Sequence, residues 1–108
     1  MELDKETQQK IHDLQHKEQT IQSMLMQKQA FQIELNETEN ALSEISKSNE
    51  IFKMVGQIIV KADKERTKKD LEKKKELLSL RLKSIEKQET EMMKDLEELK
   101  EEVMKKIK

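Results

Sequence analysis

The sequence predicts a mostly α-helical fold, an antiparallel two-helix coiled coil whose long helices are joined by one central β-hairpin. Three observations lead to this prediction. The 108-residue chain is 42% charged and 33% hydrophobic, with no proline. Its apolar residues recur at alternating spacings of three and four, which is the signature of a coiled coil. The single glycine, Gly56, lies within a β-branched run at mid-chain.

The first helix is expected over residues 4–48. Asp4 suits the N-cap and Glu6 the positive end of the helix dipole, while Asn49 suits a left-handed C-cap. Steps of three and four predict a buried stripe, with one shift of register at Met24–Lys28. The stripe comprises Leu14, Lys17, Ile21, Met24, Lys28, Phe31, Leu35, Thr38, Leu42 and Ile45.

The second helix is expected over residues 63–107, with Asp63 as its N-cap. Its stripe alternates without a break and comprises Leu71, Lys75, Leu78, Leu82, Ile85, Glu89, Met92, Leu96, Leu99, Val103 and Lys106. A short connection between two long amphipathic helices makes them antiparallel neighbours. We therefore predict a single domain over residues 1–108.

Residues 51–62 predict the β-hairpin. Gly56 supplies the positive φ that a chain reversal needs. Val55 before it argues against a type I′ turn and favours a longer loop with Gly56 in a bulge. The alternative is a kinked continuation of helix. The "SKSN" stop, Gly56, the β-branched run and the Asp63 restart argue against it.

An isolated two-stranded hairpin is marginal in water, and open strand edges are sites of association. The two helices leave nothing else in the chain to cover this one. We therefore expect the hairpin to contact other subunits. The expected interface residues are Ile51, Phe52, Val55, Gly56, Ile58, Ile59 and Val60.

Most catalytic and cofactor chemistry is excluded by composition. The chain has no cysteine and one glycine, so it has neither a thiolate nucleophile nor a phosphate-binding loop. A two-helix rod also offers no deep pocket. We expect no enzyme activity, no cofactor and no metal. His12 and His16 have a spacing compatible with a metal site, but two exposed polar residues are the simpler interpretation.

The charge balance indicates neither a nucleic-acid nor a membrane partner. Net charge is −1, and no apolar run resembles a leader or a membrane span. We expect a cytoplasmic protein. The basic stretch 64–75 is interpreted as a solvated face or as a contact for an acidic partner. It lacks the interleaved aromatics of a single-strand binder.

The far end of the helical pair carries more apolar residues than two helix ends can cover. These residues are Leu3, Ile11, Leu99, Val103, Met104 and Ile107. Methionine suits varied apolar contacts because its side chain is flexible and polarizable. Partial exposure there would mean either fraying or an adhesive tip.

The order helix, single hairpin, helix resembles the β class of prefoldin subunits, particularly the archaeal type. The segments that carry the resemblance are "NETENALSEI", "IFKMVGQIIVKADKE" and "LSLRLKSIEKQETEMMKDLEEL", which span most of the chain. Its most specific parts are Ile51–Lys53, Gly56, Ile58–Val60 and the Arg81–Glu89 region. Phe52 stands where the family often has tyrosine, and the chain ends at "KKIK" without a longer tail.

The resemblance implies an ATP-independent co-chaperone. Two α and four β subunits would join through their hairpins into a double β-barrel, from which six coiled coils extend. The coil tips would hold unfolded clients and pass them to a group II chaperonin. In this chain the hairpin residues would build the barrel, and Leu3, Ile11, Leu99, Val103, Met104 and Ile107 would contact clients.

Two other functions fit parts of the pattern. A structural homo-oligomeric coiled coil would use the same stripes as a spacer or adaptor and treat residues 51–62 as a linker. A nucleic-acid-binding rod would use residues 64–75. The hairpin separates these possibilities, because only subunit assembly requires its apolar residues.

Overall fold

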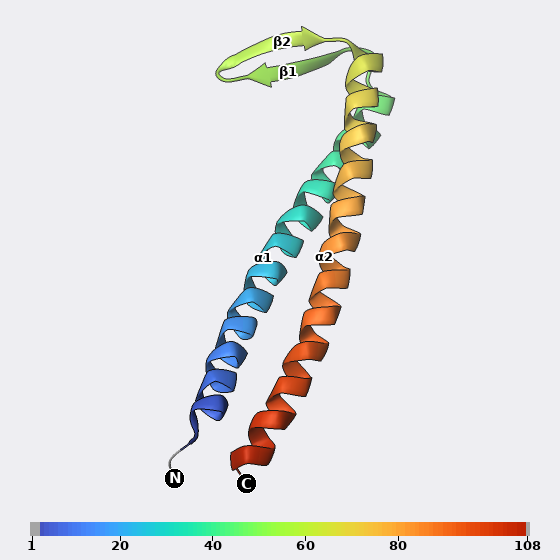
Figure 1. Cartoon of the computed structure of the whole chain (residues 1–108). Coiled ribbons are helices and arrows are strands. Elements are labelled where there is room, and N and C mark those ends of the chain that lie inside the picture. Colours follow the sequence, from blue (N-terminus) through green and yellow to red (C-terminus); the bar gives the residue numbers. More distant parts are fainter. Residues whose placement is uncertain (1–2, 108) are drawn as a thin grey trace. The chain divides into compact units, whose positions relative to one another are not determined.

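The computed structural model in Figure 1 describes residues 3–107. Its elements are helix α1 (Lys5–Lys47), strand β1 (Ile51–Val55), strand β2 (Ile58–Ala62) and helix α2 (Lys64–Ile107). The predicted fold class, two long helices with one central antiparallel hairpin, is confirmed.

The chain divides into two units, each built from a part of both helices. Unit 1 comprises Met1–Gln29 with Lys83–Lys108, and unit 2 comprises Ala30–Leu82. The division leaves both helices continuous, since α1 and α2 each run through both units. The single domain expected over residues 1–108 stays a prediction.

Ion pairs between the helices show the antiparallel arrangement inside unit 1. Lys10 lies 3.2 Å from Glu102, and Lys28 lies 3.3 Å from Glu89. The residue number on α2 therefore falls as the number on α1 rises. In unit 2, Glu34 of α1 pairs with Lys74 of α2 at 3.1 Å.

Both helices begin at the predicted aspartates. The Asp4 carboxylate accepts a hydrogen bond from the backbone N–H of Thr7 at 2.7 Å. Asp63 accepts one from the backbone N–H of Arg66 at 3.0 Å. Each carboxylate thereby satisfies an amide that has no partner within its helix.

The end of α1 differs from the prediction. No residue with a side chain has positive φ in the described part of the chain, so the left-handed cap predicted at Asn49 is wrong. The last turn tightens instead, with the backbone N–H of Ser48 donating to the Ile45 carbonyl at 3.2 Å. The Ser48 hydroxyl donates to the Glu44 carbonyl at 2.9 Å. Ser48 thus satisfies two carbonyl groups of the last turn, so the helix end needs no left-handed residue to satisfy them.

The buried stripe of α1 alternates by three and four without interruption. The shift of register predicted at Met24–Lys28 is wrong. Lys28 keeps its stripe position because Glu89 neutralises it, while Leu25 beside the stripe is 45% exposed. The half-buried or buried stripe positions are Leu3, Thr7, Lys10, Leu14, Lys17, Ile21, Met24, Lys28, Phe31, Leu35, Thr38, Leu42 and Ile45.

The stripe of α2 follows the prediction except at Lys75 and Lys106, which are exposed. Long lysine side chains can leave such a stripe and hold their ammonium groups in water. The most buried apolar residues all occupy predicted stripe positions and are 3–8% exposed. They are Leu35, Ile45, Leu78, Ile85, Leu96 and Val103.

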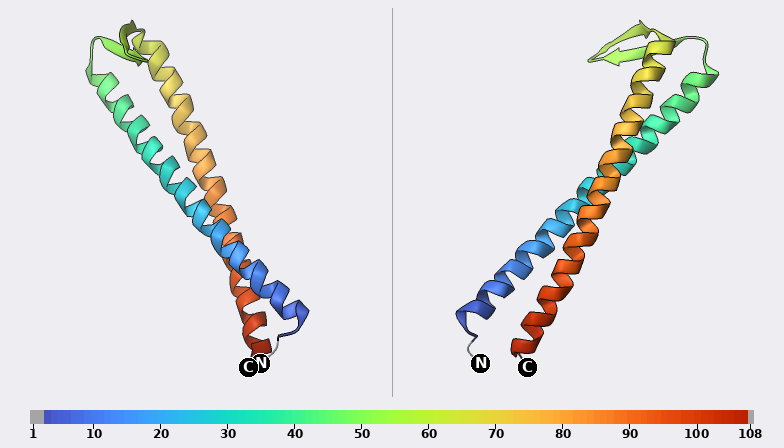
Figure 2. Two further views of the ribbon diagram at one scale, coloured as in Figure 1. Left: turned by 90° about the vertical axis from the view of Figure 1, so that its left-hand side faces the viewer. Right: turned by 45° about the vertical axis from the view of Figure 1, so that its right-hand side comes forward.

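The hairpin leaves the helices where α1 ends and α2 begins (Figure 2). Val55 pairs with Ile58, so only Gly56 and Gln57 form the loop. Gly56 has a φ of 61°, and Gln57 has no positive φ. This is the pattern of a type II′ turn, and the longer bulged loop predicted from the sequence is wrong. Type II′ requires glycine only at its first central position, and its twist matches the flanking strands.

Two leucines that are close in sequence provide a test of this packing. Leu78 is 3% exposed and Leu80 is 58% exposed. We expect Leu78→Ala to lower the free energy of unfolding by about 2–4 kcal/mol, because it leaves a cavity in the stripe. Leu80→Ala should change it by less than about 0.5 kcal/mol. Denaturation followed by far-UV circular dichroism measures both, and equal effects would contradict the assigned stripe.

Candidate functional site

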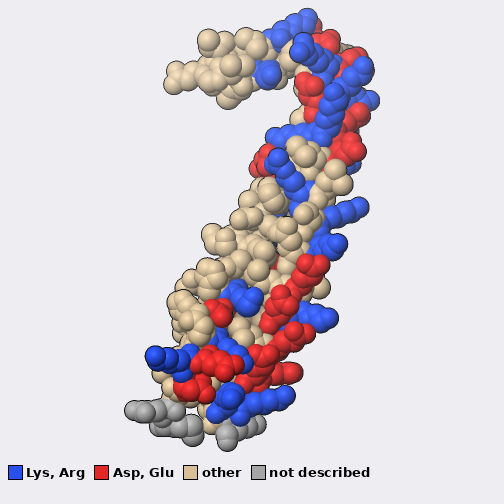
Figure 3. Space-filling model, in the orientation of Figure 1, with Lys and Arg blue, Asp and Glu red and all other residues tan. Residues whose placement is uncertain are grey.

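The hairpin exposes nearly all of its apolar side chains. The exposed fractions are 61% for Phe52, 72% for Met54, 55% for Val55, 66% for Ile58, 65% for Ile59 and 42% for Val60. Figure 3 shows this element as a mainly uncharged surface, whereas charged side chains line the helices. Apolar exposure of this density marks a contact surface.

The strand register sorts these side chains onto two faces. Directly opposed residues share a face, and successive residues alternate. Face A consists of Ile51, Lys53, Val55, Ile58, Val60 and Ala62. Face B consists of Phe52, Met54, Ile59 and Lys61. Both faces are therefore mainly apolar, unlike those of a sheet that has one side in water.

The strand edges are open as well. Within residues 3–107 the sheet has two strands, so the outer edges of β1 and β2 have no strand partner. Unpaired backbone donors and acceptors at such an edge can accept a strand from another chain. The hairpin thus has the backbone and the side chains needed for association through strands.

All seven predicted interface residues lie on this hairpin. Ile51 is half-buried and the other six are exposed. The predicted set omits Met54, which at 72% has the largest exposed fraction among the large apolar residues of the hairpin. The signal was present, because Met54 lies two residues after Phe52 and therefore shares its face.

A groove lies where the hairpin meets the helices of unit 2. It has a volume of about 420 Å³, and its apolar lining comprises Ala41, Ile45, Ile51, Phe52 and Leu71. Phe52 belongs to this lining and also to face B. The exposed apolar surface of the hairpin therefore continues into the groove.

The predicted tip residues of unit 1 differ in exposure. Leu3, Ile11 and Leu99 are half-buried. Met104 is 52% and Ile107 is 43% exposed. Val103 is only 6% exposed, so its predicted exposure is wrong. It occupies a stripe position, whereas Met104 and Ile107 are three residues apart and share an outer helix face.

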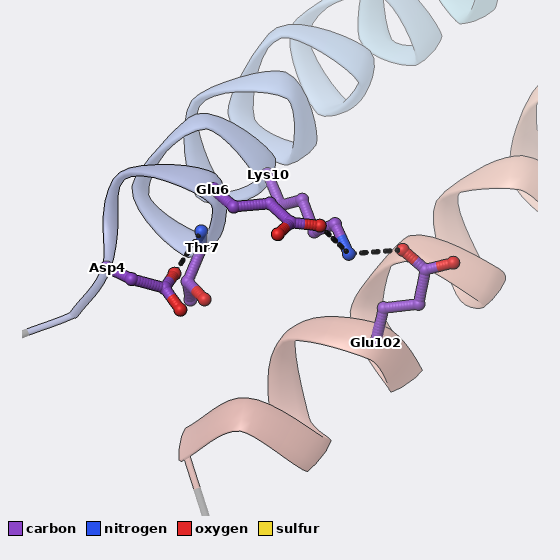
Figure 4. A network of polar contacts seen from close by, with 5 residues as sticks. All are labelled: Asp4, Glu6, Thr7, Lys10 and Glu102. Atoms are coloured by element: carbon purple, nitrogen blue, oxygen red, sulfur yellow. Dashed lines mark hydrogen bonds and ion pairs between the residues drawn. The ribbon is translucent and has the colours of Figure 1, made fainter.

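Polar contacts join the first turns of α1 to the last turns of α2 in unit 1 (Figure 4). Lys10 lies 3.5 Å from Glu6 of its own helix and 3.2 Å from Glu102 of α2. Its hydrogen bond with Glu102 raises the pKa of Lys10 above its ordinary value. At the cap, the hydroxyl and the backbone N–H of Thr7 both donate hydrogen bonds to the Asp4 carboxylate. These bonds lower the pKa of Asp4, and the hydroxyl has the larger effect.

The two histidines lie on the exposed surface of α1. His12 and His16 are both exposed, and no group of three or more potential ligands is found in the described residues. His16 lines a shallow groove of about 330 Å³ together with Asp13, Asp95 and Glu98.

The basic stretch 64–75 forms the start of α2. Lys74 is neutralised by Glu34, and Lys64 and Lys68 are half-buried. Acidic residues interrupt the stretch at Glu65, Asp70 and Glu72. Over the described range, neither helix is long and apolar enough to cross a membrane.

Two long helices joined by an uncovered apolar hairpin define a coiled-coil subunit. Comparison with known proteins agrees, since the family model for prefoldin subunits matches residues 8–108. Prefoldin subunit beta of Pyrobaculum calidifontis is 40% identical over 90 residues, which cover 81% of this chain and 72% of the relative. That of Thermococcus onnurineus is 38% identical over 96 residues, covering 86% and 83% respectively.

A solved structure resembles the whole described fold. The prefoldin beta subunit from Thermococcus strain KS-1 superposes with a TM-score of 0.84 at 32% identity, covering 96% of this chain and 94% of that one. The chain therefore belongs to the prefoldin family, as a β-class subunit. Prefoldin subunits are co-chaperones and not enzymes.

The cap at Asp4 makes the start of α1 sensitive to acid. Because the folded pKa lies below the ordinary value of 3.8, the carboxylate stabilises the cap fully above that pH. This stabilisation is lost as the pH falls through the folded pKa. We expect the Thr7 amide resonance in NMR spectra to titrate with a midpoint below 3.8. A midpoint at or above that value would contradict the hydrogen-bonded cap.

Proposed function

We propose that this chain is the β subunit of a hexameric, ATP-independent co-chaperone of the cytoplasm. Two α and four β subunits would join through their hairpins into β-barrels. The coiled-coil tips would hold unfolded proteins and deliver them to a group II chaperonin. The observation that carries the proposal is the hairpin itself, which is exposed on both faces and open at both edges.

Membership of the prefoldin family supports assembly into a prefoldin complex. The hairpin is the best-suited surface for it, because strand pairing would satisfy its open edges and bury its apolar side chains together. The interface residues in this proposal are Ile51, Phe52, Val55, Gly56, Ile58, Ile59 and Val60, to which the exposure of Met54 adds an eighth.

Client contact is assigned to the tip of unit 1. Met104 and Ile107 offer the exposed apolar surface, and Leu3, Ile11 and Leu99 contribute their half-exposed parts. Val103 would support them from beneath, because it is buried in the stripe. Weak apolar contacts of this kind suit a holdase, which must bind diverse sequences and release them.

Two charges on face A test the assembly proposal. Ile58→Asp with Val60→Asp should prevent assembly with an α-class prefoldin subunit, because face A would then bury unpaired carboxylates. The helicity of the chain should not change, since neither side chain is buried in it. Light scattering on the mixture measures the mass.

The matched control carries the same added charge on an exposed part of α2. Leu77→Glu with Leu80→Glu replaces side chains that are 48% and 58% exposed, and this variant should assemble. A face A variant that reached the wild-type mass would refute the hairpin interface and favour a spacer in which residues 51–62 are a linker.

The tip has its own test. Met104→Ser with Ile107→Ser should weaken the suppression of client aggregation by several-fold, because it removes exposed apolar area without touching the stripe. Assembly mass should stay the same. Met26→Ser with Ile33→Ser is the control, since it also removes an exposed methionine and isoleucine from a helix. Full retention of activity by the tip variant would remove the tip from the proposal.

A further inference from the structure

Face B of the hairpin poses a problem that strand pairing alone does not solve. Three of its four residues, Phe52, Met54 and Ile59, are large, apolar and 61–72% exposed. Met54 lies directly opposite Ile59, and Phe52 lies two residues from Met54 on the same face. The three side chains therefore form one continuous patch.

A closed barrel buries only one face of each strand, because residues alternate between its interior and its exterior. Face A suits the interior, since five of its six residues are apolar. Face B then points outward. If nothing else covered it, the assembled barrel would leave this patch in water, as in the single chain.

The patch also lacks the charge that would keep an outer surface solvated. The one charged residue of face B, Lys61, lies at the root of the hairpin, where it pairs with Glu50 at 3.4 Å and both side chains are exposed. At the root of the hairpin the patch continues through Phe52 into the groove lined by Ala41, Ile45 and Leu71. Face B and the apolar part of this groove form one continuous surface, whose charged residues are Lys61, Glu44 and Glu50.

We propose that a neighbouring prefoldin subunit packs its own apolar side chains against face B, so that assembly buries the hairpin on both sides. This inference rests on the proposed hairpin-mediated assembly. A neighbouring subunit is the fitting occupant, because the surface lies on the element whose open edges receive neighbouring strands.

The first arm of the test replaces the opposed pair on face B. Met54→Thr with Ile59→Thr keeps residues that tolerate a strand but removes most of the apolar area. We expect the protein concentration for half-assembly with an α-class subunit to rise about tenfold or more. Leu77→Thr with Leu80→Thr is the control and should leave it unchanged. Circular dichroism verifies that each variant keeps its helices.

The second arm measures coverage directly. The chain has no cysteine, so Met54→Cys provides one reporter thiol, read by mass spectrometry of this chain. With no client present, its rate of maleimide labelling should fall about tenfold or more on assembly, because a covered thiol reacts only when the contact opens. Leu77→Cys should label equally fast in both states.

The outcomes separate this inference from the function on which it rests. If the wild-type chain gains no mass with the α subunit, both the proposed assembly and the covered face B are refuted. If it assembles while Met54→Cys labels at an unchanged rate, or if the face B variant assembles at wild-type concentrations, only the covered outer face is refuted. Protection that appears only after client is added would assign face B to clients and also refute the proposal.

Discussion

The structure depends on one constraint, the pairing of two heptad stripes along antiparallel helices. Each stripe consists mainly of apolar residues spaced alternately three and four positions apart, and the partner helix covers them. Leu78, at 3% exposed, and Leu80, at 58%, illustrate how sharply this pairing divides residues that are close in sequence. Because the stripes bury each other, the helices cover only the root of the hairpin, where Ile51 and Ala62 are half-buried. The exposed hairpin is thus a consequence of the coiled coil.

The polar residues within the stripes restrict how the helices can pair. Lys28 and Glu89 both occupy stripe positions in unit 1, with side chains 34% and 16% exposed. A partly buried ion pair adds little net stability, but a charge left without its partner is strongly unfavourable. A change of register would set each charge against an apolar neighbour. The pair therefore penalises alternative alignments, in the way that polar core residues do in other coiled coils.

Periodicity predicted most of the fold, and its errors have physical causes. The stripes, both aspartate caps and the position of the hairpin follow from local spacing and side-chain chemistry. The register shift at Met24–Lys28 was wrong because Lys28 holds the stripe position through Glu89, 61 residues away in the chain, whereas the apolar Leu25 beside it is 45% exposed. The loop length predicted at Gly56 was wrong because it depends on which residues pair across the strands, and the local sequence does not reveal that pairing.

The candidate site was predictable to a lesser extent. Six hairpin residues could be selected by their β-branched or aromatic character and Gly56 by its turn, whereas Met54 was left out although it shares a face with Phe52. At the tip, the sequence supplied six apolar residues without their depth. Only the structure separates buried Val103 from exposed Met104 and Ile107, since adjacent stripe and outer positions differ by a small rotation around the helix.

The most direct test of the account is the solution mass of the wild-type chain, alone and mixed with an α-class prefoldin subunit, by sedimentation equilibrium. The account predicts a small species alone that converts to a hexameric mass on mixing, because the uncovered hairpin needs neighbouring strands. A fixed dimer or tetramer that ignores the α subunit would contradict it and would indicate a structural coiled coil.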